Sequence, residues 1–426
     1  MSQTGRDKLL ALLLCFCGQL SRHMMIECWS MSKPHISNSS ITTVWLSSID
    51  SVYLFSYATG NIISGSIEDS YSLRKMISGG LISSAFLYWL ISLIGYAQIN
   101  SPIPYLILWI LQGFVQSTVF PGSIAVLGHW FDYSNRGKVM GVFVSAASLG
   151  NALAAVIIGA IFSIGGTWPL SILLFSLFEL TTGLLIFFLL KEKPDKNNEE
   201  VMMVNMINED FQEHSGDVRK KSGIPFMQAI FIPNMINFVI AIACMKFINH
   251  GLSMWIPSFL SKKLDNKDLI GVLTGLFEIG TLFGTIVCGW VGDRIKSRPP
   301  VISLFILVSI PVLVALVFLD KTVWVYFFVV PVAGFFAGAP NSILTGAVPV
   351  DLAQNSNIDH FEAMATIAGI IDGSGGYGAG IGIFVLGNLA KVSWDYVFGF
   401  MLVIGVVAFI SLFSISLNGI RVFINR

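Results

Sequence analysis

Long apolar stretches follow one another along almost the whole chain, with short polar segments between them. About 20 apolar residues suffice to cross a bilayer as an α-helix, which satisfies its own backbone groups where lipid offers no hydrogen-bond partner. The pattern predicts an all-α transmembrane protein with twelve spans. We expect these spans at residues 8–30, 44–67, 76–97, 104–128, 138–164, 169–190, 226–260, 269–292, 301–319, 323–348, 362–389 and 394–417.

The longest polar segment, residues 191–223, is charged and poor in aromatic residues. A segment of this composition cannot bury enough apolar surface to fold alone, so we interpret it as a flexible linker. It divides the chain into an N-terminal half of six spans, 1–190, and a C-terminal half of six spans, 224–426.

Composition supports a membrane protein, because 54% of the residues are hydrophobic and only 12% are charged. Soluble domains carry about twice that share of charge. The 25 basic and 25 acidic side chains balance, so nothing favours a nucleic-acid partner. We find no nucleophile elbow, no phosphate-binding glycine loop and no histidine–cysteine metal spacing. The sequence therefore predicts no enzyme, no metal and no cofactor.

Lysine and arginine residues outside the spans are distributed unequally across the membrane, with 17 on the side of the N-terminus and 6 on the opposite side. We place Lys33 among the six on the opposite side. Cytoplasmic loops carry such an excess, so both termini are expected in the cytoplasm. Asn38 begins an Asn-Ser-Ser triplet on the opposite side, where glycosylation occurs. We consider it a candidate glycosylation site.

Two basic residues lie inside apolar stretches, Arg22 in the first span and Lys246 in the seventh, 224 positions apart. The same offset relates Gly65 and Asp69 to Gly289 and Asp293, which indicates two homologous halves. A charge inside a membrane costs several kcal/mol and must face something polar. Our hypothesis is a carrier with an anion site between the halves, because a guanidinium and an ammonium can replace the hydration of an anion.

The alternative is that each cation is neutralised by an acid within the membrane. The candidate acids are Glu27, Asp50, Glu179, Glu278 and Asp372. Asp50, Glu278 and Asp372 could also gate the carrier or bind protons in a coupled cycle.

Further polar residues in apolar spans are candidates for the cavity wall. Tyr57, Gln116 and Asn249 could bind a ligand or only bond neighbouring helices, and Asn249 shares a helix face with Lys246. His23, next to Arg22, could titrate near neutral pH or simply pack.

The segments Gly65–Asp69 and Gly289–Asp293, the latter followed by Arg294, fall at cytoplasmic span ends. Glycine permits a tight helix exit, and aspartate can accept from a neighbouring helix N-terminus. We interpret Asp69, Asp293 and Arg294 as gate or hinge residues.

The repeated glycine–aspartate segments and the division into six and six spans resemble the major facilitator superfamily. Within it, an ordered set of motifs resembles the sugar-phosphate exchangers of the organophosphate:phosphate antiporter group, over nearly all of the chain. The motifs are Leu20-Ser-Arg22, Asp50 to Gly65, Gln112 to Gln116 with Pro121, Trp130-Phe131 with Arg136-Gly137, Lys246 with Trp255-Ile-Pro257, and Ile370-Ile-Asp372-Gly373.

The resemblance implies two six-helix halves related by a pseudo-two-fold axis along the membrane normal. It implies that Arg22 and Lys246 hold a phosphoryl group, that Tyr57 and Gln116 line the cavity, and that Glu278 belongs to an internal ion-pair network. It further implies exchange of a sugar phosphate or glycerol phosphate for inorganic phosphate by alternating access. The group includes an endoplasmic reticulum transporter, so that membrane is suggested, with the plasma membrane or another organelle as alternatives. We expect a monomer in the lipid bilayer.

The chain departs from the family at three positions. His23 replaces a frequent lysine, Ala146 a frequent histidine, and Asn61 a lysine of the bacterial members. A site with fewer fixed cations is also compatible with a substrate that carries a single negative charge. The excess of acids inside the spans makes a proton-coupled symporter of another small organic anion the alternative function.

Overall fold

The computed structural model describes residues 3–37, 40–68, 72–131, 133–194, 230–295, 297–318, 323–354 and 360–424. In these ranges all regular structure is helical. The helices are α1 (Gln3–Ile36), α2 (Thr43–Glu68), α3 (Leu73–Tyr96), α4 (Pro102–Gln116), α5 (Val119–Trp130), α6 (Tyr133–Ser163), α7 (Trp168–Leu189), α10 (Met235–Lys263), α11 (Leu269–Ile295), α12 (Arg298–Phe318), α13 (Val323–Ala333), the π-helix η1 (Gly334–Gly338), α14 (Ala339–Gly346), α15 (Val348–Gln354), α16 (His360–Val392) and α17 (Trp394–Ile424).

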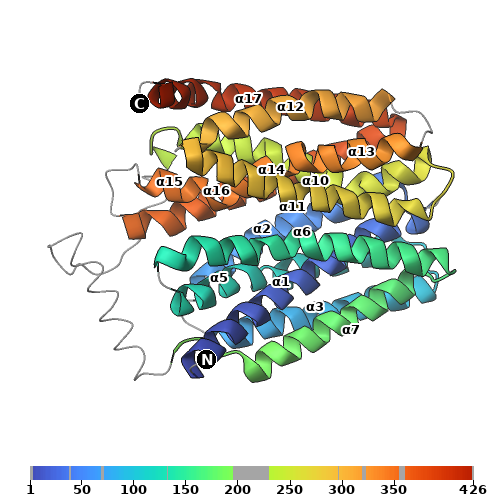
Figure 1. The fold of residues 1–426 in the computed structure, drawn as a ribbon. Helices are drawn as coiled ribbons and strands as arrows, with labels where there is room; N and C mark the ends of the chain where they lie inside the picture. The colour runs from blue at the N-terminus through green and yellow to red at the C-terminus, as the bar shows by residue number, and fades with distance from the viewer. Residues whose placement is uncertain are drawn as a thin grey trace.

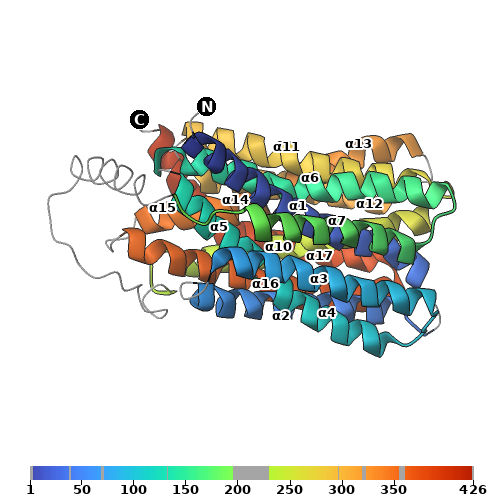
Figure 2. The ribbon, with the colours of Figure 1, turned by 90° about the horizontal axis from the view of Figure 1, so that it is seen from below.

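The helices form one elongated bundle, with both chain ends at the same end of it (Figures 1 and 2). We name this the terminal end and the opposite one the far end. Eleven helices or helix runs in the described ranges are long and apolar enough to cross a membrane. The 26-residue α2 is the twelfth long helix, and its polar residues, which include Asp50, Asn61 and several serines, lower its hydropathy. The predicted all-α, twelve-helix membrane fold is confirmed.

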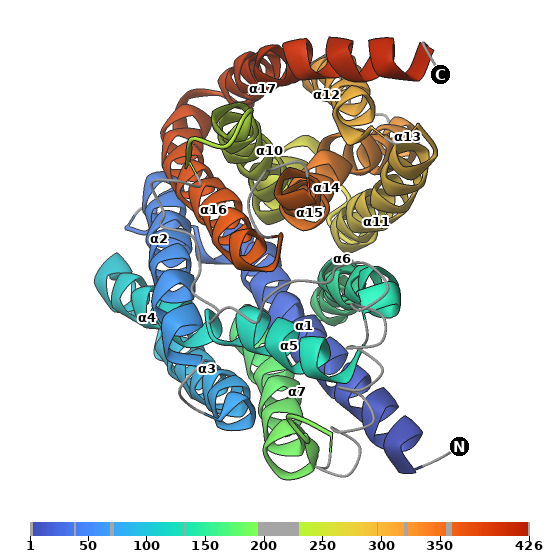
Figure 3. The same cartoon turned by 90° about the vertical axis from the view of Figure 1, so that its left-hand side faces the viewer.

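Seen from the terminal end, α1 to α7 and α10 to α17 form two neighbouring groups (Figure 3). The groups contact each other along three helix pairs, α1 with α10, α2 with α16, and α6 with α11. Asp69, Asn38 and residues 195–223 of the expected linker lie outside the described residues. The division at 191–223 remains a prediction.

Small residues permit close approach between the two groups. A Cβ added to Gly159 of α6 would lie 2.9 Å from the Cα of Gly271 on α11, and one added to Gly387 of α16 would collide with Ser47 of α2. Association in lipid depends on such close packing, since water does not drive the helices together. These contacts hold the two groups tightly together.

Two of the expected spans are not continuous α-helices. The fourth is divided into α4 and α5 around Ser117 and Thr118, whose hydroxyls donate back to the carbonyls of Phe114 and Val115. Pro121 then lacks the N–H that would bond to Ser117. The tenth passes through the π-helix η1 just after Pro331. Proline and a π-helical insertion are both recognised causes of helix distortion.

The first helix corrects the expected boundary at residue 30. It continues to Ile36, and Lys33 is fully buried within the bundle instead of lying in an outer loop. Hydropathy falls after Trp29 because Ser30, Ser32 and Lys33 are polar. Their polar groups nevertheless find partners inside the bundle, such as the Cys28 carbonyl for Ser32 at 2.6 Å.

Candidate functional site

Arg22 lies on α1 with only 4% of its surface exposed, and it interacts electrostatically with His250 on α10, in the other group of helices. Its Nε donates to the Gln19 side chain at 3.3 Å, and its Nη2 lies 2.8 Å from His23 Nε2. The guanidinium lies over the Tyr57 ring, 5.1 Å from its centre. No carboxylate of the described residues forms an ion pair with it. The buried carboxyl of Glu179 acts on Arg22 electrostatically without forming an ion pair with it. A buried arginine without an ion-pair partner is poised to bind an anion.

A chain of hydrogen bonds supports the wall beside Arg22. Tyr53, which contacts Arg22, donates to Gln116 Oε1 at 2.8 Å. Gln116 Nε2 in turn donates to the Ser84 hydroxyl at 3.0 Å, and Ser84 donates to Glu179 at 3.0 Å. Gln116 is fully buried, so its amide is engaged in bonding α4 to α2 and α3. Tyr53, which the sequence analysis did not single out, stands between Gln116 and the cation.

Lys246 on α10 is 9% exposed and forms an ion pair with Asp372 on α16. Its Nζ lies 2.6 Å from Asp372 Oδ1 and donates at 3.3 Å to the carbonyl of the same residue. Gly375 leaves room for the lysine stem, because a Cβ there would lie 2.8 Å from Lys246 Cδ. Lys246 therefore carries its own ion-pair partner, whereas no described carboxylate forms an ion pair with Arg22.

His250, one turn beyond Lys246, is a second residue that the sequence analysis missed. It interacts electrostatically with Lys246, with Asp372 and with Arg22, and also with His23 on α1. The Nδ1 atoms of both histidines are buried without a hydrogen-bond partner among the described residues. Asn249 instead faces α14, where Asn341 Nδ2 lies 3.5 Å from its Oδ1. Position i+4 from a buried lysine was the signal that could have identified His250.

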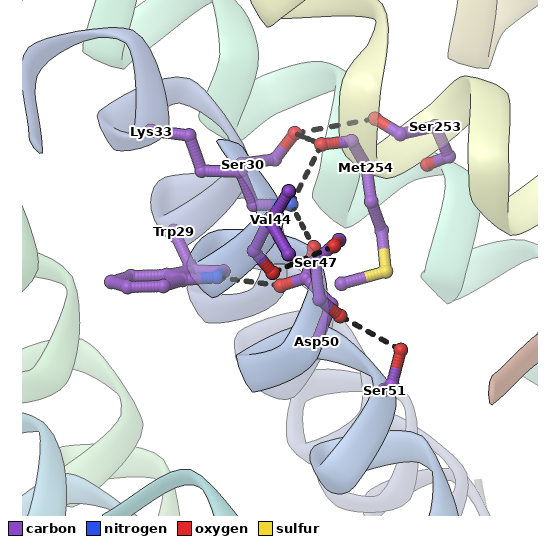
Figure 4. A network of polar contacts seen from close by, with 9 residues as sticks. All are labelled: Trp29, Ser30, Lys33, Val44, Ser47, Asp50, Ser51, Ser253 and Met254. Carbon is purple, nitrogen blue, oxygen red and sulfur yellow. Dashed lines mark hydrogen bonds and ion pairs between the residues drawn. The ribbon is translucent and has the colours of Figure 1, made fainter. Parts of the chain in front are cut away.

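A second polar network lies nearer the far end, around Lys33 (Figure 4). Lys33 Nζ lies 2.5 Å from Asp50 Oδ2, and both side chains are completely buried. Trp29 Nε1 donates to the other oxygen of Asp50 at 2.8 Å. Asp50 therefore pairs with Lys33, a cation that the sequence analysis had placed outside the membrane. We name Trp29, Lys33 and Asp50 the far-end network.

The far-end network reaches across to α10. Lys33 donates to the Met254 carbonyl at 3.0 Å, and Ser30 donates to the same carbonyl at 2.7 Å (Figure 4). Ser30 also lies 3.3 Å from the Ser253 carbonyl. Pro257 explains the free acceptor at Ser253, because proline has no N–H for the carbonyl four residues earlier. The contact between α1 and α10 thus uses two backbone acceptors of α10, of which Pro257 leaves one, the Ser253 carbonyl, without an intrahelical donor.

The glycine–aspartate segment of the second half lies at the terminal end. Asp293, in the last turn of α11, accepts from Arg298 Nη2 at 2.8 Å, and Arg298 Nη1 pairs with Asp351 of α15. Arg294 lies over the Trp290 ring, 4.3 Å from its centre. These residues connect α11, α12 and α15, far from Arg22 along the bundle.

Twelve membrane helices in two groups, with buried cations where the groups meet, define a secondary transporter. The chain belongs to the Major Facilitator Superfamily, whose family model matches residues 15–355 and 261–418. It is 30% identical to the human protein named "Sugar phosphate exchanger 3", over 90% of this chain and 82% of that protein. It is 28% identical to "Putative glycerol-3-phosphate transporter 3" of Arabidopsis thaliana, over 84% of this chain and 73% of that protein.

Solved structures confirm the fold. A bacterial homologue of the human lysosomal transporter Spinster, in an inward-facing and occupied conformation, superposes with a TM-score of 0.70 at 15% identity, covering 100% of this chain and 99% of that chain. A D-xylose-proton symporter superposes with a TM-score of 0.68 at 14% identity, covering 95% and 96%.

Proposed function

We propose that this transporter exchanges a sugar phosphate or a glycerol phosphate for inorganic phosphate by alternating access. The relatives named above are exchangers and transporters of such phosphate esters, at about 30% identity over most of the chain. The two groups of helices would rock about the site, which would face one side of the membrane and then the other.

The observation that carries the proposal is the absence of a carboxylate partner for Arg22 in the described part of the chain. A guanidinium offers a planar fork of donors that matches two phosphoryl oxygens. Tyr57 fixes its plane from one side. In this proposal Lys246 and His250 approach the same anion from α10, and His23 from α1.

Lys246 can join the anion only after it exchanges Asp372 for the substrate, since the ion pair is formed in this structure. We propose that Asp372 acts as an internal counter-ion of the empty carrier. In this proposal Glu278 and Asp50 join helices at the far end during the cycle. Asp293 and Arg294 do the same at the terminal end.

The topology is also proposed. Both termini would be cytoplasmic, because basic residues gather at the terminal end, and burial of Lys33 reduces the count on the other side from six to five. The protein would act as a monomer, with the endoplasmic reticulum as the first membrane to test. Asn38 would then face the lumen, where its glycosylation can be detected as a mass shift that glycosidase removes.

A second candidate is a proton-coupled symporter of another small organic anion. The Lys246–Asp372 pair favours it, because Arg22 then remains as the site cation that forms no ion pair with a described residue, which suits a single negative charge. Carboxylates and phosphate monoanions carry this single negative charge, whereas phosphate dianions carry two.

The experiment is uptake of labelled inorganic phosphate into proteoliposomes preloaded with phosphate, glucose 6-phosphate, glycerol 3-phosphate or buffer alone. Exchange predicts that internal phosphate compounds stimulate uptake and that Arg22→Ala abolishes it. Lys267→Ala, which removes an exposed lysine, is the control and should retain uptake. Retained phosphate transport in folded Arg22→Ala protein would contradict the proposal. Failure of every preload with folded wild-type protein would favour the second candidate.

A further inference from the structure

Glu179 on α7 is a buried carboxyl group that the proposed function leaves without a role. Its side chain has no exposed surface. The Ser84 hydroxyl donates to its Oε1 at 3.0 Å, whereas its Oε2 is buried without a hydrogen-bond partner in the described ranges. No described residue forms an ion pair with it. A carboxylate in such surroundings stays ionised only if a positive charge acts on it from nearby.

Arg22 on α1 lies close to Glu179 in depth. The two helices pack against each other, and α1 begins at the terminal end whereas α7 begins at the far end (Figure 1). A Cβ added to Gly18 of α1 would lie 3.2 Å from Ile186 Cδ1 of α7, so these two positions are in contact. Counted from this contact toward the far end, Arg22 is about 6 Å away and Glu179 about 10 Å away along the helices. Their depths therefore differ by about one helical turn.

A chain of buried hydrogen bonds leads to Glu179, and every donor in it points the same way. The Gln116 amide fixes the direction, because its Nε2 donates to Ser84 at 3.0 Å and to the Tyr88 hydroxyl at 3.2 Å. Its Oε1 can only accept, so the Tyr53 hydroxyl uses its single proton there, at 2.8 Å. Ser84 accepts from Gln116 and therefore donates its own proton to Glu179.

The orientation of Tyr53 determines what Arg22 meets at the start of this chain. With its proton directed at Gln116, the Tyr53 oxygen presents only lone pairs, and it hydrogen-bonds the Arg22 side chain, which only donates. Hydrogen bonds thus run from Arg22 to Glu179 through Tyr53, Gln116 and Ser84. Such a chain polarises in one direction in a protein interior, so the cation and the ionised carboxylate stabilise each other through it.

The charged and titratable groups that face Glu179 come from three helices. Arg22 acts on it from α1, Tyr88 from α3 and Tyr53 from α2. The third helix packed against α7, after α1 and α3, is α6, and its residues 139–163 include no ionisable side chain. Arg22 is the member of this set that carries a positive charge.

We propose that Glu179 is the remote counter-ion of Arg22 and that it binds one proton when an anion occupies the site. In the empty carrier the ionised carboxylate balances the guanidinium through the chain of hydrogen bonds. A bound anion neutralises the guanidinium, and the carboxylate loses the positive charge that kept it ionised. A proton from solvent then forms an O–H bond at Oε2, the oxygen that has no other partner.

The proposal deepens the proposed function and rests on it, because it requires that Arg22 binds the anion. Either anion of an exchange would bind at the same cation, so one proton accompanies each of them in turn. Exchange itself then moves no net proton across the membrane. The proton also lowers the total negative charge that the site must hold with one unpaired cation.

The link between the two residues is tested without any substrate. Infrared spectra of the full-length protein in lipid vesicles, recorded across a pH titration, contain the carbonyl stretch of protonated carboxyl groups. The Glu179 signal is the part that Glu179→Gln removes. In Arg22→Gln the titration midpoint of this signal should rise by at least about one pH unit, a tenfold change in proton affinity, because no cation then favours the ionised form.

A second variant tests the hydrogen bonds and keeps both charges. Tyr53→Phe breaks the chain and should also raise the midpoint, whereas Arg22→Lys keeps the cation and should change it less than Arg22→Gln does. Glu27→Gln is the matched control, because Glu27 is another buried carboxyl group, 1% exposed, outside the chain. It should leave the Glu179 signal and its midpoint unchanged. Monodispersity and unfolding temperature check that each variant is folded.

Phosphate then separates this proposal from the proposed function. Phosphate added to wild-type vesicles above the midpoint should make the Glu179 signal appear. A signal that does not titrate in wild type, or a midpoint that stays unchanged in folded Arg22→Gln or Tyr53→Phe, would overturn the proposal. Wild-type binding of labelled phosphate without the signal would refute the proton step alone. The expected midpoint shifts without binding or exchange of any phosphate compound would refute the proposed function alone.

Discussion

Lys33 and Asp50 form an ion pair in the interior of the bundle, with 2.5 Å between Nζ and Oδ2 and no exposed surface on either side chain. Such a pair contributes little net stability against an apolar substitute, but removal of one partner leaves an uncompensated charge. Its location at the contact of α1, α2 and α10 makes it a sensitive reporter of how the far end is held closed.

Lys33→Met should lower the free energy of unfolding by about 3–5 kcal/mol, because it leaves Asp50 buried and unpaired. Asp50→Asn should have a similar effect through Lys33. The double variant should recover much of the loss, since both charges are then absent. The unfolding temperature of each of the three variants, measured in detergent, reports these changes in stability.

The control for this prediction is the pair of Lys191 and Asp7, which are 45% and 20% exposed. Exposed pairs contribute about 0–1 kcal/mol, so Lys191→Met should change the unfolding temperature little. Equal effects at the two sites would contradict the interpretation of Lys33 as a buried structural charge.

Asp372→Asn should strengthen phosphate binding by about tenfold or more, because it frees the Lys246 ammonium for the anion. Equilibrium binding of labelled phosphate to purified protein measures the change. Asp372→Glu keeps the counter-ion and should stay near wild type. Unchanged or weaker binding in folded Asp372→Asn protein would show that Lys246 does not take part.

Tyr57→Leu should weaken phosphate binding by about threefold to tenfold, because the ring face below Arg22 contributes about 1 kcal/mol at a partly buried site. Tyr57→Phe preserves that face and should bind like wild type. Comparable losses in the two variants would instead assign the effect to the hydroxyl. The measurement is the same phosphate-binding titration.

Gly387→Val should hold the far end apart, because even a Cβ at this position collides with Ser47. Overpacking of about 1–3 kcal/mol shifts a two-state equilibrium by about fivefold or more. A membrane-impermeant thiol reagent should then label Met254→Cys faster, in protein whose five native cysteines have been replaced. Gly399→Val is the matched control, because a Cβ there meets no atom within 4 Å. Equal labelling of the two variants would contradict the prediction.

The twelve membrane helices could be predicted because lipid imposes a minimum apolar length on every span. The interruptions could not. Ser117 and Thr118 look like ordinary span residues until their hydroxyls are seen to bond back to the chain, and η1 depends on how α13 packs against α11. These are tertiary effects that a window of hydropathy does not contain.

For the site, Arg22 and Lys246 were found because a charge inside an apolar stretch stands out. The same rule failed at Lys33, which follows a serine and sits where a span was expected to end. Its burial depends on Asp50, Trp29 and the Met254 carbonyl, partners that only the folded chain brings together. Likewise, the partners of Glu278, Ser253 and Asn151, lie on two other helices, α10 and α6.

The contact between Lys33 and α10 uses the backbone carbonyl of Met254, which every amino acid possesses. Position 254 is therefore free to drift among apolar residues of similar volume without losing the bond, whereas position 33 must keep a long cationic donor. Natural variation in this transporter should consequently concentrate harmful substitutions on the donor side of the contact, at Lys33, and leave the acceptor residue itself tolerant.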